Sequence, residues 1–446
     1  MRRLRRPTGG LWNNVDFVKL WTGQSISEFG SQISQLAVPL LAADSLHANP
    51  LQFSLLGVLG FLPFILFALP AGVWVDRLRR RPILIAGDAA RAVLLSLIPI
   101  LWATHTLRLW HLLVLQFVIG VCTVVFDVAY QSYIPSLVER DQLVEGNSKL
   151  QLTVAVAQVA GPSASGGLIA AITAPYAVVL DAVSFVISTI FMLRMRHRER
   201  PPEHAAGEPR PKMWPDVKEG VRWVVGHPWL RAIATCTGAS NFFATLLFAI
   251  MILYARRTLH LSPVEIGAVF AVGSIGSIGG ALVVNRLQRR IGVGPTIVLT
   301  AISFSLGGLA YPLAPKSFPL PYLMLGQVLF GFGSVAYNIT QVSLRQAITP
   351  ERLQGRMNAA MRWIVWGTIP LGSLAGGAIG QAYSLHAALW VGAIGGLFTF
   401  LPVTLTSVRS IRELPEPVTE PTAAGAELAG GLIEGTALPG PAAADA

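Results

Sequence analysis

Stretches of about 20 consecutive apolar residues recur along nearly the whole chain. A helix of that length crosses the hydrocarbon core of a bilayer, and a soluble domain has no use for so many of them. Hydrophobic residues make up 53% of the 446 residues and charged residues only 13%, which is beyond the composition of a soluble protein. The sequence therefore predicts an all-α membrane protein whose length is used for membrane spans.

We expect twelve spans in two groups of six. Their expected ranges are 15–43, 52–75, 82–105, 109–137, 147–172, 174–196, 228–256, 263–285, 293–314, 319–346, 356–382 and 385–408. The two halves are then residues 15–196 and 228–408. Residues 197–227 are polar and proline-rich, which predicts a cytoplasmic, flexible linker. Residues 1–14 form a basic N-terminus, and residues 409–446, rich in Ala, Gly, Pro and Glu, predict a disordered tail.

Basic residues gather at every second boundary between the predicted spans. This side holds Arg2, Arg3, Arg5, Arg6, Arg77 to Arg81, Arg140, Lys149, the linker, Arg286, Arg289, Arg290, Arg352 and Arg356, whereas the opposite loops hold Arg108, Arg256, Arg257 and Lys316. The positive-inside rule then places both termini in the cytoplasm of a cell whose plasma membrane holds the protein. The net charge of +11 therefore reflects orientation in the membrane, and we expect no nucleic-acid partner.

Motifs of enzyme chemistry are missing from the sequence. It contains no GxxxxGK[ST], HExxH or GxSxG pattern, and the two cysteines lie inside predicted spans without a CxxC or His partner. We expect no enzyme activity, no cofactor and no metal site.

The two halves repeat each other in sequence. AGVWVDRLRRR at 71–81 returns as GALVVNRLQRR at 280–290. A similar shift aligns polar and glycine positions elsewhere: Asp127 with Asn338, Asn147 with Asn358, and Gly161 with Gly372. Parallel repeats of six helices are a transporter architecture, in which a cavity between the halves alternates its access.

GVWVDRLRRR at 72–81 resembles the GxxxDRxxRR signature of the major facilitator superfamily, through Gly72, Asp76, Arg77, Arg80 and Arg81. AGPSASGG at 160–167 resembles the antiporter motif of exporters in that superfamily, through Gly161, Pro162, Gly166 and Gly167. Four further stretches resemble the branch of enterobactin and macrolide exporters: residues 20–34, 134–148, 180–188 and 217–231. The resemblance covers residues 15 to 410 and implies a major facilitator fold and export.

The first of these motifs predicts a gate. Gly72 lets another helix approach closely, Asp76 can accept hydrogen bonds from a helix N-terminus of the opposite half, and the arginines can pair with acids on neighbouring helices. Such a latch would hold the outward-facing state and break when the cytoplasmic side opens. The alternative is that the arginines mark topology only, which leaves Asp76 without a role.

Charges inside the predicted spans are functional candidates, and we assign them to the first half. Asp88 and Arg91 share one helical face and either satisfy each other or form a charge network with Asp127. The second-half counterparts of Asp76 and Asp127 are Asn285 and Asn338.

Glu28 is the first candidate for proton coupling, because it lies about 20 Å along its helix and no basic residue is near it in sequence. The alternative is a carboxylate satisfied by hydrogen bonds from Gln24, Ser27, Ser31 and Gln32. Asp181 is the second candidate, near the outer end of its helix, where water is expected to solvate it.

Polar and aromatic residues that share helical faces are candidates for lining the substrate cavity. They are Gln24, Gln35, Asn241, Phe242, Asn338, Gln341, Trp363 and Trp366. Aromatic rings with amides and one acid suit a bulky, amphipathic and cationic solute. The alternative for each amide is a hydrogen bond between helices.

We therefore predict a monomeric secondary transporter that exports an amphipathic drug, siderophore or metabolite by alternating access, in exchange for protons. Its partners are the solute, protons and the lipid bilayer. An importer or facilitator of the same fold, or a membrane protein that only binds partners, are the alternatives.

Overall fold

Every regular element in the described part of the chain is a helix. The computed structural model describes residues 10–75, 78–197, 199 and 213–415. The first half contains η1 (Leu11–Asn13), α1 (Val15–Leu40), η2 (Leu41–Ser45), α2 (Pro50–Val75), α3 (Arg80–Ala103), α4 (Leu109–Leu137), η3 (Arg140–Gln142), α5 (Leu143–Ile172) and α6 (Ala174–Leu193). The rest contains α7 (Met213–Gly226), α8 (Pro228–Arg257), α9 (Pro263–Ile291), α10 (Val293–Leu313), α11 (Leu320–Ala347), α12 (Glu351–Trp366), α13 (Thr368–Ala382), α14 (Leu385–Leu397), α15 (Leu401–Thr404) and η4 (Ser407–Ser410).

Eleven segments are long and apolar enough to cross a membrane, with α12 and α13 counted as one segment and α14 and α15 as another. The twelfth is α1, which is less apolar because it carries Asp16, Lys19 and Glu28. Its 26 residues extend about 39 Å, which exceeds the thickness of a hydrocarbon core. It lies along α5 and α6, so these neighbours cover part of its polar surface. The prediction of twelve spans and an all-α membrane fold is confirmed.

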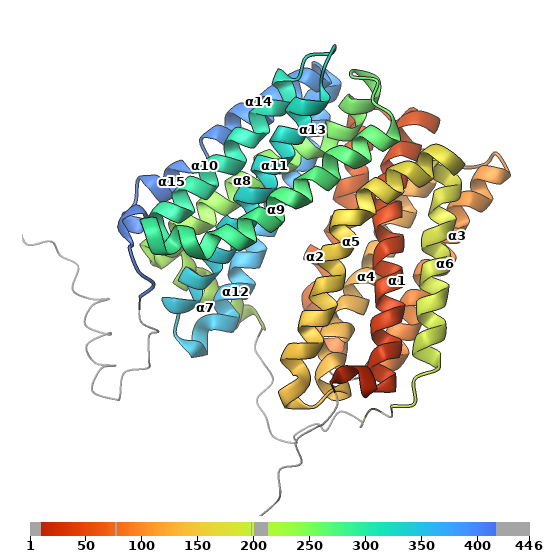
Figure 1. The fold of residues 1–446 in the computed structure, drawn as a ribbon, viewed down its shortest axis with the longest axis horizontal. Coiled ribbons are helices and arrows are strands. Elements are labelled where there is room, and N and C mark those ends of the chain that lie inside the picture. Colours follow the sequence, from red (N-terminus) through yellow and green to blue (C-terminus); the bar gives the residue numbers. More distant parts are fainter. Residues whose placement is uncertain (1–9, 76–77, 198, 200–212, 416–446) are drawn as a thin grey trace, which may run out of the picture.

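The six-helix halves have matching internal contacts (Figure 1). In the N-terminal half, α1 contacts α5 and α6, and α2 contacts α4. In the C-terminal half, α8 contacts α13 and α14, and α9 contacts α11. The repeat read from the sequence therefore has a counterpart in helix packing.

The two ends of the bundle differ in how the halves meet. We call the end where α1 begins, α6 ends and α7 lies the linker face, and the opposite end the far face. One buried apolar cluster joins both halves toward the far face, including Leu36, Phe53, Leu247 and Ile266. Near the linker face each half has its own cluster, Leu11 to Met195 in one half and Val224 to Ile411 in the other. Figure 1 accordingly shows the bundles together at the top and apart at the bottom.

Glycines let the helices of the two halves cross closely near the far face. Gly166 of α5 faces the carbonyl of Pro263 in α9, and Gly267 of α9 faces the carbonyl of Pro162. Ser373 Oγ of α13 donates to the Ser54 carbonyl of α2 at 3.0 Å. An ion pair between Arg256 and Asp44, with 2.7 Å between Nη2 and Oδ2, adds to this closure.

The end of the predicted linker is ordered, because α7 packs on α12. Val224 of α7 is fully buried, and Gly220 lies against the backbone of Arg356. Glu219 pairs with Arg352 at 3.1 Å and with Arg356. The start of the predicted tail is ordered too, since the carbonyl of Ile411 accepts a hydrogen bond from Gly294 N at 2.8 Å. The proline-rich and charged sequence does not indicate these contacts, because each contact depends on a partner far away in the chain.

Candidate transport cavity

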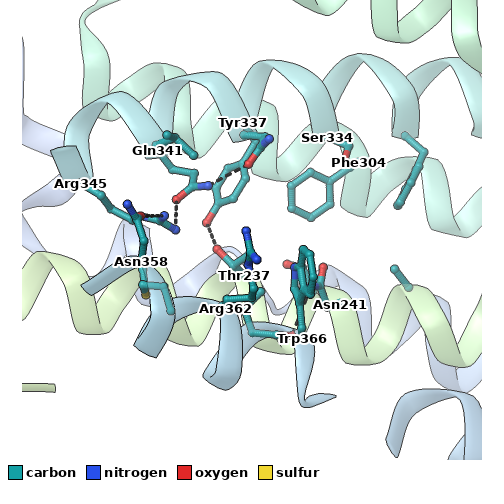
Figure 2. Close-up of a pocket in the computed structure, with 17 residues that line it drawn as sticks. Thr237, Asn241, Phe304, Ser334, Tyr337, Gln341, Arg345, Asn358, Arg362 and Trp366 are labelled. Atoms are coloured by element: carbon teal, nitrogen blue, oxygen red, sulfur yellow. Dashed lines mark hydrogen bonds between the residues drawn. The ribbon is translucent and has the colours of Figure 1, made fainter. Parts of the chain in front are cut away.

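The C-terminal half contains a cavity of about 460 Å³. Residues of α8, α10, α11 and α12 line it, and Figure 2 shows their side chains converging from these helices. The polar lining residues include Thr237, Ser240, Asn241, Ser334, Asn338, Gln341, Arg345, Asn358 and Arg362, and the aromatic ones are Phe304, Phe330, Tyr337 and Trp366. Polar and aromatic side chains therefore share the wall of this cavity, and convergent polar groups of this kind can fix the orientation of a small molecule.

Arg345 is the charged group of a hydrogen-bonded chain in this cavity (Figure 2). Its Nη1 donates to Gln341 Oε1 at 3.1 Å and its Nη2 donates to Asn358 Oδ1 at 3.0 Å. Gln341 in turn donates through Nε2 to Asn338 Oδ1 at 3.0 Å. These amides fix the guanidinium without neutralising its charge, since no carboxylate takes part.

A second cavity of about 300 Å³ lies between the halves. Phe64, Ile65, Ala68 and Val128 line it from the N-terminal half, and α12 lines it from the other. Trp366 borders both cavities, with the Arg362 guanidinium 4.8 Å above its ring and the Phe61 ring of α2 at 5.7 Å. The C-terminal cavity therefore lies next to the space between the halves.

Five of the eight predicted cavity residues line these two cavities. Asn241, Asn338, Gln341 and Trp366 line the first, and Trp363 lines the second with Trp366. The other three line neither: Gln24 donates to Ser188 Oγ of α6 at 3.2 Å, Gln35 is exposed, and the backbone of Phe242 packs on Gly372.

The assignment of all charges within spans to the first half missed Arg345 and Arg362. Both lie inside the expected spans 319–346 and 356–382, so the rarity of charges in membrane helices was the signal that could have identified them. Both arginines lie close to the ends of their spans, where arginines normally mark topology, so their positions alone do not distinguish them from topological arginines.

Four acids of the N-terminal half, Glu28, Asp88, Asp127 and Asp181, lie near one arginine, Arg91. Arg91 pairs with Asp88, and its guanidinium lies 4.2 Å and 4.4 Å from the ring centres of Phe126 and Phe185. Ser188 Oγ donates to Asp88 Oδ2 at 2.6 Å. The predicted pair is therefore a fully enclosed polar unit that joins α3 to α6.

Arg91 also lies near enough to act electrostatically on Glu28, Asp127 and Asp181. Glu28 thus has a cation near it in space, although none is near it in sequence. The four acids come from four helices, α1, α3, α4 and α6, so only the packing of the bundle brings them together.

The expectation that water solvates Asp181 is wrong. Its side chain is only 2% exposed, and Ser184 Oγ lies 3.3 Å from its Oδ1. Gly30 of α1 packs against the same two residues, so the close crossing of α1 and α6 excludes water there.

Two arginines of the predicted gating motif contact the end of α6 and the start of the linker. Glu199 accepts hydrogen bonds from the backbone N of Arg80 at 2.6 Å and of Arg81 at 3.3 Å, at the N-terminus of α3. Arg81 Nη2 donates to the carbonyls of Met192 at 3.2 Å and Leu193 at 3.0 Å, at the end of α6. Asp76 and Arg77 lie outside the described residues.

Gly72 has no close neighbour, since a Cβ built on it would meet nothing within 4 Å in the described part of the chain. The close helix approach expected at Gly72 is therefore not made while the linker face is open.

The antiporter-like motif lies where the halves cross. A Cβ on Gly161 would lie 2.5 Å from Gln32 Cγ of α1, and one on Gly166 would lie 2.5 Å from Pro263 O of α9. A Cβ on Gly167, the next residue, would meet nothing within 4 Å among the described residues. Gly161 thus serves packing within the half, and Gly166 serves the contact between halves.

Comparisons with known proteins agree with this architecture. A sequence profile described as Major Facilitator Superfamily matches residues 20–369 and, separately, 233–438. Among solved structures, a bacterial homologue of the iron transporter ferroportin in the inward-facing state is 17% identical, with a TM-score of 0.67, over 87% of this chain and 98% of that one.

Curated relatives are exporters by name. The multidrug efflux pump Tap of Mycolicibacterium fortuitum is 26% identical, over 84% of this chain and 92% of that protein. Macrolide efflux protein A of Streptococcus pyogenes is 23% identical, over 90% and 98%. The enterobactin exporter EntS of Citrobacter koseri is 25% identical, over 76% and 74%. With a matching profile over most of its length and a twelve-helix fold in two halves, the chain belongs to the Major Facilitator Superfamily and is a membrane transporter of small molecules, not an enzyme.

Proposed function

We propose that the protein exports an amphipathic small molecule from the cytoplasm in exchange for protons, by alternating access. The observation that carries this proposal is the pair of cavities, which lie in and between halves that are joined at the far face and separate near the linker face. A solute can therefore load from the linker face in this conformation.

The proposed direction of transport rests on the distribution of basic residues and on the similarity to efflux proteins. Arginines and lysines are concentrated at the linker face, which the positive-inside rule places in the cytoplasm together with both termini. Loading from the cytoplasm is the first step of export, and the relatives named above are efflux proteins. We take the working unit to be a monomer in the plasma membrane, since one chain supplies both halves and both cavities.

Proton coupling rests on the acids of the N-terminal half. Glu28 is half-buried near the middle of α1, and Asp127 and Asp181 lie near the same arginine. A carboxylate that binds a proton on one side of the membrane and releases it on the other couples transport to the gradient. One proton moving through 100 mV supplies about 2.3 kcal/mol, or a roughly 50-fold concentration ratio for a neutral solute exchanged one for one.

We assign the gating motif a role in closing the linker face. In that state Asp76 would accept hydrogen bonds from a helix N-terminus of the C-terminal half, and Gly72 would provide room for the approach. The open space at Gly72 supports this role, because it remains free for a partner that arrives on closure.

The test is transport by inverted membrane vesicles of Glu28→Gln and wild type at equal expression, with a radiolabelled macrolide and a panel of labelled aromatic amphipaths. Wild type should accumulate at least one compound when a pH gradient is imposed. Glu28→Gln keeps size and hydrogen bonding but cannot release a proton, so it should still exchange labelled for unlabelled compound without accumulating it.

Two results would contradict the proposal in different ways. Full gradient-driven accumulation by Glu28→Gln would remove Glu28 as the coupling residue and move the search to Asp181, Asp127 and Asp88. Uptake in the reverse direction, or movement of no compound by wild type, would remove export itself.

A further inference from the structure

The C-terminal cavity carries positive charge without a counter-ion. Arg345 and Arg362 both line it, and no acidic side chain from the described residues does. Among the described residues neither arginine forms an ion pair: Arg345 is bonded to two amides, and Arg362 stacks on Trp366. Glu28, Asp127 and Asp181, the acids near Arg91, lie in the other half.

The orientation of the Arg345 side chain fits ligand binding better than a role in membrane topology. It lies near the linker-face end of α11, where an arginine that only marks topology would extend its head toward the membrane surface. Instead its guanidinium turns back to Gln341, one helical turn deeper, and across to Asn358 of α12. Its Nε is buried without a hydrogen-bond partner among the described residues, and so is Ser240 Oγ in the same cavity.

The second arginine lies close by on the same face of α12. Arg362 follows Asn358 by four residues, so the two side chains are neighbours on the helix. Stacking on Trp366 holds its guanidinium at the boundary of the two cavities. Two cations held by amides and an aromatic ring keep their charge available for a ligand, and a guanidinium fork matches the geometry of a carboxylate.

The remaining wall suits a flat apolar group. Phe304, Phe330, Tyr337 and Trp366 line the cavity, whose volume of about 460 Å³ lies in the usual range for small-molecule sites. We propose that this cavity is a subsite for the acidic group of an aromatic solute, with Arg345 and Arg362 binding the carboxylate or a similar anion and the rings packing on the apolar part. The substrate class is then an organic anion or a molecule with an acidic group, in contrast to the cationic solute expected from the sequence.

This inference refines the proposed function, and it rests on that function only in taking the occupant to be the transported solute. Binding is therefore the measurement. Full-length protein in nanodiscs of uncharged phosphatidylcholine is dialysed against three probes that share one ring system: naphthalene carboxylate, naphthalene carboxamide and protonated naphthalene methylamine. Empty nanodiscs correct for partition into lipid.

Wild type should bind the carboxylate about 10- to 100-fold more tightly than the carboxamide, as expected for hydrogen bonds to charged groups. Arg345→Gln keeps hydrogen-bond donors but loses the charge, so the preference should disappear. Arg345→Lys should retain part of it, since an ammonium keeps the charge without the fork. Arg194→Gln is the matched control, because Arg194 is exposed at the end of α6 and lines neither cavity; its preference should equal that of wild type.

The ratio of carboxylate to carboxamide affinity is measured within each protein, so a change in the amount of folded protein does not affect it. If Arg345→Gln fails to fold, Arg345→Lys and Arg362→Gln carry the test, each with an expected loss of the preference by about tenfold. Equal binding of the three probes by wild type, or an unchanged anion preference in these variants, overturns the subsite.

The two proposals fail separately. Anion binding that depends on Arg345 in a protein whose Glu28→Gln variant accumulates compounds normally would remove proton coupling and leave the subsite. Gradient-driven export by wild type, together with an anion preference that does not depend on Arg345, would remove the subsite and leave proton-coupled export.

Discussion

A single methyl group on Gly166 is expected to shift the protein away from the conformation described here. A Cβ at this position would lie 2.5 Å from Pro263 O and 3.1 Å from Val264 Cα. Carbon and oxygen atoms normally approach no closer than about 3.3 Å, so α5 and α9 would have to separate by roughly 1 Å. The far-face contact between the halves is therefore the part of the structure that Gly166→Ala perturbs.

The first turn of α9 cannot easily unwind to relieve this contact. The start of α9 is held by a capping box in which Glu265 N donates to Ser262 Oγ at 3.3 Å and Ser262 N donates to Glu265 Oε2 at 2.7 Å. A second close crossing, Gly267 against the Pro162 carbonyl, lies beside it. Overpacking of this kind costs about 1–3 kcal/mol, which corresponds to a factor of about 5 to 150 in the balance between conformations.

The location of the contact determines which conformation Gly166→Ala favours. Because the contact exists while the far face is closed, Gly166→Ala should favour the state in which the linker face closes and the far face opens. Gly167→Ala is the matched control, since it adds the same methyl group one residue later, where no atom of the described part of the chain lies within 4 Å. Both substitutions raise helix propensity equally, so their difference isolates the contact.

Electron–electron distance measurements between spin labels at Val144 and Glu351 provide the assay. Both positions are exposed at the linker-face ends of α5 and α12, and Cys122 and Cys236 would be replaced first. Gly166→Ala should move population from the long distance to a shorter one, and Gly167→Ala should match the parent. Identical distance distributions for the two variants would refute the role assigned to Gly166.

Two further outcomes are expected. Asp76→Asn should impair vesicle transport strongly without affecting membrane insertion, whereas Asn285→Asp in the second copy of the motif should do much less; wild-type transport by both variants would leave the motif with a topological role only. Gly220→Val should undock α7 from α12, at a cost of about 1–3 kcal/mol, because its side chain would meet the backbone of Arg356, and trypsin should then cut faster at Lys218 and Arg222. Gly226→Val, where a Cβ meets nothing within 4 Å, is the control for that experiment, and equal cutting of the two variants would show that α7 does not depend on this contact.

The class of protein, the twelve spans, the repeat of the two halves and the family can all be predicted from the sequence. Each of these follows from a local pattern: the length of an apolar helix is set by the thickness of the bilayer, and a repeated motif is visible without knowing what it touches. Which polar groups meet depends instead on how the helices pack. Arg91 lies near acids from α1, α4 and α6 only because small residues such as Gly30 let the helices approach closely. Arg345 turns toward Gln341 and Asn358 rather than toward the membrane surface because the fold places Asn358 of α12 on the wall of the same cavity. Such contacts depend on the rotation and crossing of helices far apart in the chain, so no local pattern contains them.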